Sequence, residues 1–162
     1  MFKRRPILAR LPDRAHADAI LYSTMRAVYH FERTLIARFG LGYPEICLLQ
    51  LLRRKSGIRV SDAARVLEIP LFSATRLVQR LESDGYVKKR QDAEDRRAIL
   101  LSLSPKGRRL ICRIEDDNYE LIMANAAALT GKELDALVLV AGKTGRLLGV
   151  EGSASEGLDP AP

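Results

Sequence analysis

The chain has 162 residues, a sequence pI of about 9.7 and a formal net charge of +7. This length favours one domain with a substantial core and excludes two independent enzymatic domains. No apolar run approaches the length of a membrane span, and no apolar segment of signal-peptide length follows the basic N-terminus. We therefore expect a soluble, cytoplasmic protein with no membrane partner.

The positive charge is concentrated in one segment. Residues 53 to 113 hold 16 Lys and Arg against 7 Asp and Glu, a net charge of +9, whereas the other residues hold 11 and 13, a net charge of −2. A localised basic surface attracts a polyanion through counterion release, and DNA phosphate is the usual candidate. On charge alone, a solvated face of a basic protein is the alternative interpretation.

The first half of the chain predicts four helices. Apolar residues at three- and four-residue intervals indicate a long helix over about 13–39, which Gly40 ends. A second helix begins near Pro44 and stops at the basic run 53–55, and a short strand covers 58–60. Ser61 is the predicted cap of a third helix, and the turn 68–70 leads into a fourth, which Gly85 closes.

A β-hairpin and two helices follow. Strands over 86–90 and 98–103 surround a polar tip, Ser104 and Pro105 begin a fifth helix over about 105–128, and Thr130 begins a sixth over about 131–149 with a capping-box pattern. We predict a flexible basic N-terminus at 1–14 and a disordered tail at 150–162. The fold class is then mainly α with a small β-wing. A winged helix-turn-helix at about 43–104 is flanked by three long helices, within one domain over 15–149.

The three long helices carry more apolar surface than one winged domain can cover. A second copy of the chain would cover the remainder, so we expect these helices to be dimerisation helices of a homodimer. A two-fold axis would also place two basic helices side by side, which suits a palindromic site on double-stranded DNA.

The fourth helix carries the predicted DNA-reading face. Its periodicity assigns one face to the core, made of Leu71, Ala74, Leu77, Val78 and Leu81, and leaves a second face pointing away, made of Ser73, Thr75, Arg76, Gln79 and Arg80. A bidentate arginine on guanine is the commonest specific contact in the major groove. Each arginine could instead meet a phosphate or an acidic neighbour, and the other polar side chains could serve bases or phosphates. Phe72 either contacts thymine methyl groups or packs on the neighbouring helix.

This segment resembles the MarR family of bacterial winged helix-turn-helix repressors. The wing signature D-x-R, five residues, L-[TS]-x-x-G appears as Asp95, Arg97, Leu103, Ser104 and Gly107, and the helix ending T-R-L-V-x-R-L-E-x-x-G-[YL]-V is residues 75–87. The resemblance covers roughly residues 15–149. It departs from the family at Glu68, where a small residue or glycine is usual, at Pro70, where a capping side chain is usual, and at Gly42, where Ser or Thr is usual.

The resemblance implies a transcriptional regulator, most simply a repressor that binds a palindromic operator and is released by a small effector. Arg76 matches a base-reading arginine, and Arg97 matches an arginine that enters the minor groove, with Asp95 holding it. Lys88, Lys89, Arg90 and Arg96 are interpreted as phosphate contacts. The basic run 53–55 is either another phosphate contact or a solvated face.

A mixed aromatic stripe on the first helix is a candidate effector site. Tyr22, Met25, Tyr29 and His30 recur at helical spacing, which is typical of a dimer or domain core. Members of the family bind small aromatic acids between the first helix and the reading domain. By resemblance, these four residues with Tyr43 and Cys47 form the predicted effector pocket.

We expect no enzyme, no cofactor and no metal site. The chain has no phosphate-cradling glycine loop and no nucleophile-base motif. His16 and His30 are fourteen residues apart with no third ligand nearby, and Cys47 and Cys112 lack metal-site spacing. Two alternatives to a ligand-released repressor remain: an architectural DNA-binding protein of low sequence specificity, and a repressor controlled by cysteine oxidation. The apolar neighbours of both cysteines argue against oxidation.

Overall fold

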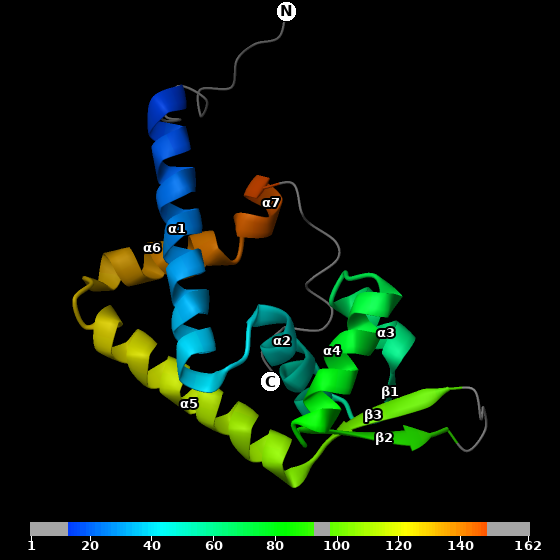
Figure 1. Ribbon diagram of the computed structural model, residues 1–162. Coiled ribbons are helices and arrows are strands. Elements are labelled where there is room, and N and C mark those ends of the chain that lie inside the picture. The colour runs from blue at the N-terminus through cyan, green and yellow to red at the C-terminus, as the bar shows by residue number, and fades with distance from the viewer. Residues whose placement is uncertain (1–12, 93–97, 149–162) are drawn as a thin grey trace, which may run out of the picture. The chain divides into compact units, whose positions relative to one another are not determined.

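We analysed a computed structural model of the chain, which describes residues 13–92 and 98–148. The described residues form seven helices and three strands (Figure 1). The chain divides into two compact units between Gly42 and Tyr43, and each is described by itself. In chain order the elements are α1 (Arg14–Phe39), α2 (Tyr43–Arg54), β1 (Ile58–Arg59), α3 (Val60–Val66), α4 (Leu71–Ser83), β2 (Val87–Gln91), β3 (Ile99–Leu103), α5 (Pro105–Ala126), α6 (Gly131–Ala141) and α7 (Thr144–Leu148).

The first unit contains α1, whose predicted ends are confirmed. Asp13 caps the helix by accepting a hydrogen bond from the backbone N–H of His16 at 2.8 Å. Gly40 ends it in the left-handed conformation, at φ 70°, and its N–H donates to the carbonyl of Ile36.

The core of the second unit lies between α2, α4, α5 and the sheet. Its fully buried side chains come from all four: Leu48, Leu49 and Leu52 of α2, Val78 and Leu81 of α4, Leu101 of β3, and Ile111 and Ile114 of α5. Helix α2 packs on α5 and β3, and α3 packs on α4. The fold class, mainly α with a small antiparallel sheet, is as predicted.

The sheet has the order β1-β3-β2, and both pairings are antiparallel. Strands β2 and β3 form the predicted wing, with Val87 opposite Leu103 and Lys89 opposite Leu101. Asp95, Arg96 and Arg97 at the wing tip lie outside the described residues, as do the predicted flexible N-terminus and disordered tail, apart from Asp13 and Arg14, which begin α1.

The base of the wing is joined closely to the start of α5. The Ser104 hydroxyl donates to the carbonyl of Gly85 at 2.6 Å and accepts from the N–H of Gly107 at 2.9 Å, which confirms the predicted helix cap. A Cβ at Gly107 would collide with the backbone carbonyl of Tyr86. The Ser104 and Gly107 positions of the wing signature therefore hold the wing against α5.

Three local predictions are wrong. Ser61 does not cap α3, because β1 passes into the helix at Val60 and leaves Ser61 inside its first turn. The predicted continuous helix over 131–149 is broken after Ala141, where Gly142 has low helix propensity, and α7 follows. Leu71, assigned to the core face, is 56% exposed because it opens the first turn of α4 beside the sheet.

The turn between α3 and α4 contains Glu68, where the sequence departs from the pattern that it resembles. Glu68 has a φ of 54°, a left-handed conformation that glycine adopts without strain. Glycine, which the resemblance leads us to expect at this position, would relieve that strain. The first turn of α4 also has no side-chain cap at Pro70.

No single helix among the described residues is long and apolar enough to cross a membrane. Helices α1 and α2 reach the required length and composition only when they are counted together as one bent pair.

Candidate nucleic-acid interface

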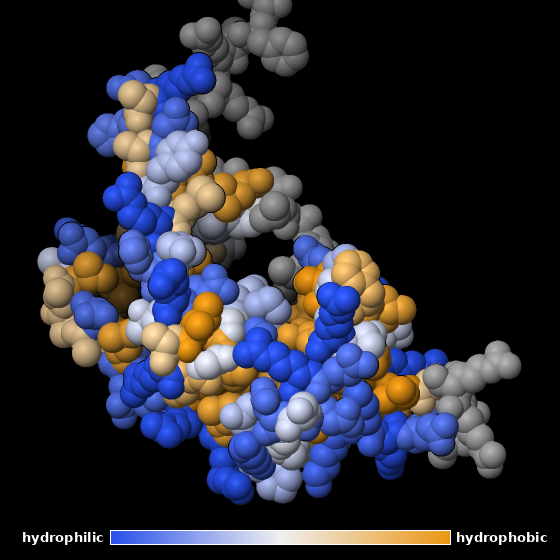
Figure 2. Space-filling view, viewed as in Figure 1, coloured by the Kyte–Doolittle hydropathy of each residue, from blue (hydrophilic) through white to orange (hydrophobic). Residues whose placement is uncertain are grey.

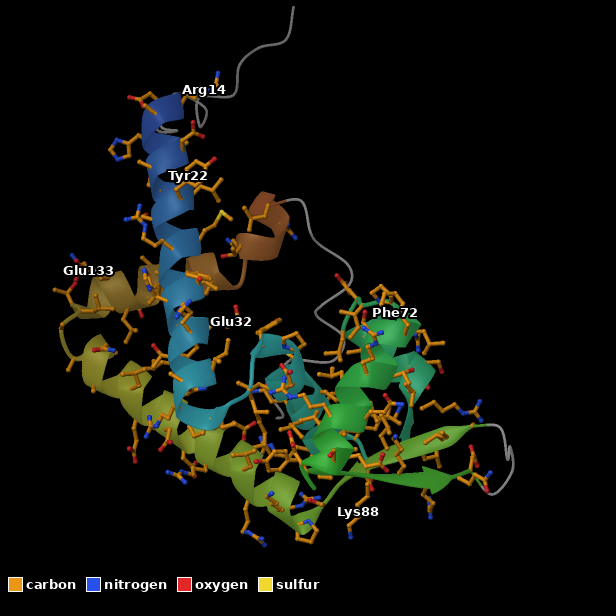
Figure 3. All side chains as sticks on the ribbon, viewed as in Figure 1. Arg14, Tyr22, Glu32, Phe72, Lys88 and Glu133 are labelled. Carbon is orange, nitrogen blue, oxygen red and sulfur yellow. The ribbon has the colours of Figure 1, made fainter. Side chains whose placement is uncertain are left out.

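The outward face of α4 is a stripe of exposed side chains. Successive helical residues rotate by about 100°, so Phe72, Arg76 and Gln79 share the centre of the face opposite Ala74, Val78 and Leu81. All three are exposed, and Figure 3 shows Phe72 at the N-terminal end of the helix. Neither Arg76 nor Gln79 pairs through its side chain with another residue that the structure describes. This stripe therefore exposes one aromatic ring and two polar side chains that are available to a binding partner.

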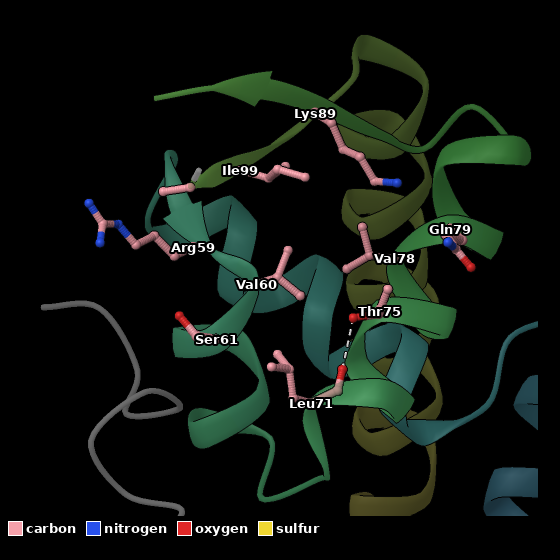
Figure 4. Close-up of a pocket in the computed structure, with 10 residues that line it drawn as sticks. Arg59, Val60, Ser61, Leu71, Thr75, Val78, Gln79, Lys89 and Ile99 are labelled. Atoms are coloured by element: carbon pink, nitrogen blue, oxygen red, sulfur yellow. Dashed lines mark hydrogen bonds between the residues drawn. The ribbon is translucent and has the colours of Figure 1, made fainter. Parts of the chain in front are cut away.

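A groove separates the wing-side flank of α4 from the sheet. It has a volume of about 470 Å³. It is lined by residues from β1, the start of α3, α4, β2 and the beginning of β3: Arg59, Val60, Ser61, Leu71, Thr75, Val78, Gln79, Lys89, Ala98 and Ile99 (Figure 4). The Thr75 hydroxyl donates to the carbonyl of Leu71 at 2.9 Å. Polar and apolar side chains of α4 and of the wing strands therefore line the same groove.

Two cations beside the groove have acidic partners. The Lys89 ammonium lies 2.6 Å from a carboxylate oxygen of Glu82 on α4, and the Arg59 guanidinium lies 3.2 Å from Asp92. The first pair ties β2 to α4, and the second ties β1 to the end of β2. These ion pairs hold the wing at its position beside the helix.

Arg80 is exposed, as predicted, but it lies at the edge of the outward face and has an acidic neighbour, the alternative that the sequence left open. Its guanidinium donates to Glu45 Oε1 at 2.8 Å, and Asp84 lies 4.0 Å away. The Glu45 side chain is only 12% exposed. Position 80 is rotated by about 80° from the centre of the stripe, toward α2, so its acidic neighbour is supplied by that helix. Ser73 is half-buried on the same flank.

The wing lysines and arginine divide between two faces of β2. Val87 is buried, and Lys89 points toward α4 (Figure 4). Lys88 and Arg90 are exposed, and strand alternation puts them on the opposite face; Figure 3 labels Lys88. Charge alone groups Lys89 with its neighbours. Strand alternation starting at the apolar Val87 is the signal that separates it from them. Phosphate contact by Lys88 and Arg90 remains a prediction.

The predicted effector residues fall in both units. Tyr22, Met25 and Tyr29 on α1 are each more than half exposed, and the rings of Tyr29 and His30 are 5.9 Å apart. Tyr43 and Cys47 lie one turn apart at the start of α2. Burial raises the pKa of the Cys47 thiol, and a hydrogen bond with Cys47 raises the pKa of Tyr43 to about 12. A shared effector pocket remains a prediction. Within the described ranges, no three His, Cys, Asp or Glu side chains come together as metal ligands would.

Comparison with known proteins finds transcriptional regulators similar to this chain. A family model described as the MarR family matches residues 39–98. The regulator TtmR of Methylorubrum extorquens is 28% identical over 115 residues, which cover 71% of this chain and 56% of TtmR, so the match spans little more than half of that relative. The regulator MgrA of Staphylococcus aureus is 24% identical over 76% of this chain and 83% of its own.

Solved structures share the fold. Streptococcus pneumoniae FabT, crystallised in complex with DNA, superposes with a TM-score of 0.72 at 19% identity, over 85% of this chain and 98% of FabT. A mutant of MarR from E. coli superposes with a TM-score of 0.67 at 18% identity, over 83% and 96% of the two chains. The family match over residues 39–98, the named relatives and the winged fold agree: the chain is similar to the MarR family of winged helix-turn-helix transcriptional regulators.

Proposed function

We propose that the protein is a homodimeric repressor that binds a palindromic operator in the cytoplasm and is released by a small aromatic or amphipathic effector. The observation that carries this proposal is the outward face of α4, where Arg76 and Gln79 are exposed and make no side-chain pairing with any described residue. Unpaired hydrogen-bond donors on a helix that fits the major groove are what base-edge recognition requires.

The remaining contacts follow from this placement of α4. Arg76 and Gln79 would face base edges, while Ser73 and Thr75 on the flanks would meet bases or the adjoining backbone. Lys88 and Arg90 on the outer face of the wing, together with Arg96, would contact the flanking phosphates, and Arg97, held by Asp95, would enter the minor groove. FabT, which has the same fold, was crystallised in complex with DNA, and this supports DNA binding as the function of the fold.

The homodimer is supported by the surface of α6. None of its residues is buried, and Leu137, Val138, Leu139 and Val140 are between 55% and 66% exposed. Such a contiguous apolar surface on one chain is typical of an interaction site. A second copy of the chain would cover it and would pair two α4 helices across the two-fold axis.

The effector would bind the aromatic residues of α1, and the resemblance adds Tyr43 and Cys47 of α2 as further candidate contacts. The exposed Tyr22, Met25 and Tyr29 offer an apolar face, and His30 and Tyr43 offer polar groups for a carboxylate. Release requires only that the effector favour a dimer whose two α4 helices are wrongly spaced, and a coupling of about 1–3 kcal/mol would weaken binding by about 5–150-fold.

The test is selection of a binding site from a random double-stranded DNA library, followed by affinity measurements at one fixed salt concentration. We expect a palindrome to be enriched and to bind at least about 10³-fold more tightly than a scrambled duplex of equal length. Nearly equal affinity for the two duplexes would instead show an architectural protein. Enrichment of a single, unrepeated half-site would contradict the dimeric mode of binding.

A further inference from the structure

The proposed function leaves Phe72 unexplained. Its side chain is 66% exposed, and among the aromatic residues that the structure describes none is more exposed. It therefore does not pack on the neighbouring helix. It also lies on the polar face of α4, where the next residue along the stripe is Arg76. A large apolar side chain on such a face suits a partner that has a small apolar group surrounded by polar groups.

The surroundings of Phe72 identify the chemistry of that partner. Leu71 beside it is 56% exposed and lines the groove toward the wing, and Figure 2 shows hydrophobic surface at the turn between α3 and α4 next to hydrophilic surface along α4. The segment 53–113 that contains this face carries a net charge of +9. A strongly basic surrounding fits a polyanion and not the apolar core of a protein interface.

We propose that Phe72 is a specificity-determining residue that contacts the C5-methyl group of a thymine in the major groove. The thymine methyl is the apolar group that DNA presents there, and phenylalanine is one of the side chains suited to it. The inference rests on the proposed function, because it requires α4 to enter the major groove.

The position of Phe72 on α4 sets where this thymine lies. Phe72 is the second residue of the helix, and the N-terminal residues of a recognition helix approach the base edges. Residues four apart on a helix have Cβ atoms about 5–6 Å apart, which corresponds to one or two base steps of about 3.4 Å. The thymine therefore lies within about two base pairs of the one that Arg76 contacts, in each half-site.

The experiment uses the full-length protein and the site enriched from the random library. Each thymine of that site is replaced singly by deoxyuridine, which removes only the C5-methyl group and keeps base pairing. At one thymine per half-site we expect binding to weaken roughly 2–5-fold, the size for one buried methyl group. Phe72→Ala should bind the thymine and deoxyuridine duplexes equally, whereas Phe72→Leu should keep part of the difference.

Two comparisons make the result specific. Arg76→Ala, changed one turn away on the same face, should keep the deoxyuridine effect at this position. Thermal unfolding of Phe72→Ala should match the parent protein, because the side chain is exposed. The inference is overturned if the parent protein is indifferent to every deoxyuridine, or if Phe72→Ala keeps the full methyl effect or loses affinity equally on all sequences. Failure to enrich any site would contradict the proposed function itself, a distinct outcome.

Discussion

Gly107 is a position where a single methyl group should be damaging. A Cβ there would meet the backbone carbonyl of Tyr86, which cannot move without shifting the base of the wing. Gly107→Ala should lower the free energy of unfolding by about 1–3 kcal/mol, as overpacking of a close contact does. Gly131→Ala is the matched control, because its Cβ would meet open space, and it should be neutral or slightly stabilising. Chemical denaturation measures both; equal effects would show that the contact at Gly107 relaxes freely.

The state of Cys47 decides between ligand release and oxidation. Burial raises the pKa of its thiol, so the folded protein holds a smaller thiolate fraction at neutral pH than the unfolded chain does. In a Cys112→Ser background, Cys47 should react slowly with an aromatic disulfide reagent at pH 7. The reaction should accelerate as the pH rises toward the raised pKa, and should be fast in denaturant.

The same cysteines provide a functional check. A Cys47→Ser, Cys112→Ser protein should release the operator with an aromatic carboxylate as the parent protein does. Release by peroxide that disappears in this double variant would establish redox control and contradict the ligand mechanism.

At the scale of elements, α4 is tied to α2 by Arg80 and Glu45. Removing Arg80 would leave a carboxylate in a largely buried position, so Arg80→Ala should cost about 1–3 kcal/mol of unfolding free energy. Glu45→Gln should also lower the free energy of unfolding. The double variant should lose less of this free energy than the sum of the two single losses. Arg65→Ala, which breaks an exposed pair with Asp62, should cost only about 0.2–1 kcal/mol.

The same variant distinguishes a structural role of Arg80 from a role in DNA recognition. Arg80→Ala should leave the base preferences of the selected site unchanged while affinity falls. Unchanged stability together with a relaxed preference at one base pair would return Arg80 to the DNA-reading face.

Local sequence signals predicted two helix caps correctly. Ser104 and Thr130 cap their helices as expected, because a cap depends on residues three apart in the chain. The partner of Arg80 could not be predicted in the same way, because Glu45 is 35 residues away and its approach depends on how α2 packs. The break after Ala141 was missed because the apolar period continues through the glycine to Leu148.

At the scale of the whole molecule, the apolar surface of α6 should make the fold depend on a second copy. Leu134→Glu or Leu137→Glu would place a charge on that surface and should yield aggregated or unfolded chain instead of a stable monomer. Asp135→Asn on the same helix should leave a folded dimer, because it adds no charge to the apolar side. Sedimentation velocity with circular dichroism distinguishes these states, and a folded, soluble Leu137→Glu monomer would refute the dimer.

The central claim is that the outward face of α4 reads base edges, and Arg76 tests it most directly. The measurement is the affinity of Arg76→Ala for a panel of duplexes in which each base pair of the selected site is changed in turn. Loss of a base-edge contact worth about 1–3 kcal/mol should weaken binding to the selected site and abolish discrimination at one base pair in each half-site, with the other preferences kept. Affinity that falls by the same factor on every duplex would show that Arg76 contacts phosphate and that α4 does not read the sequence through it.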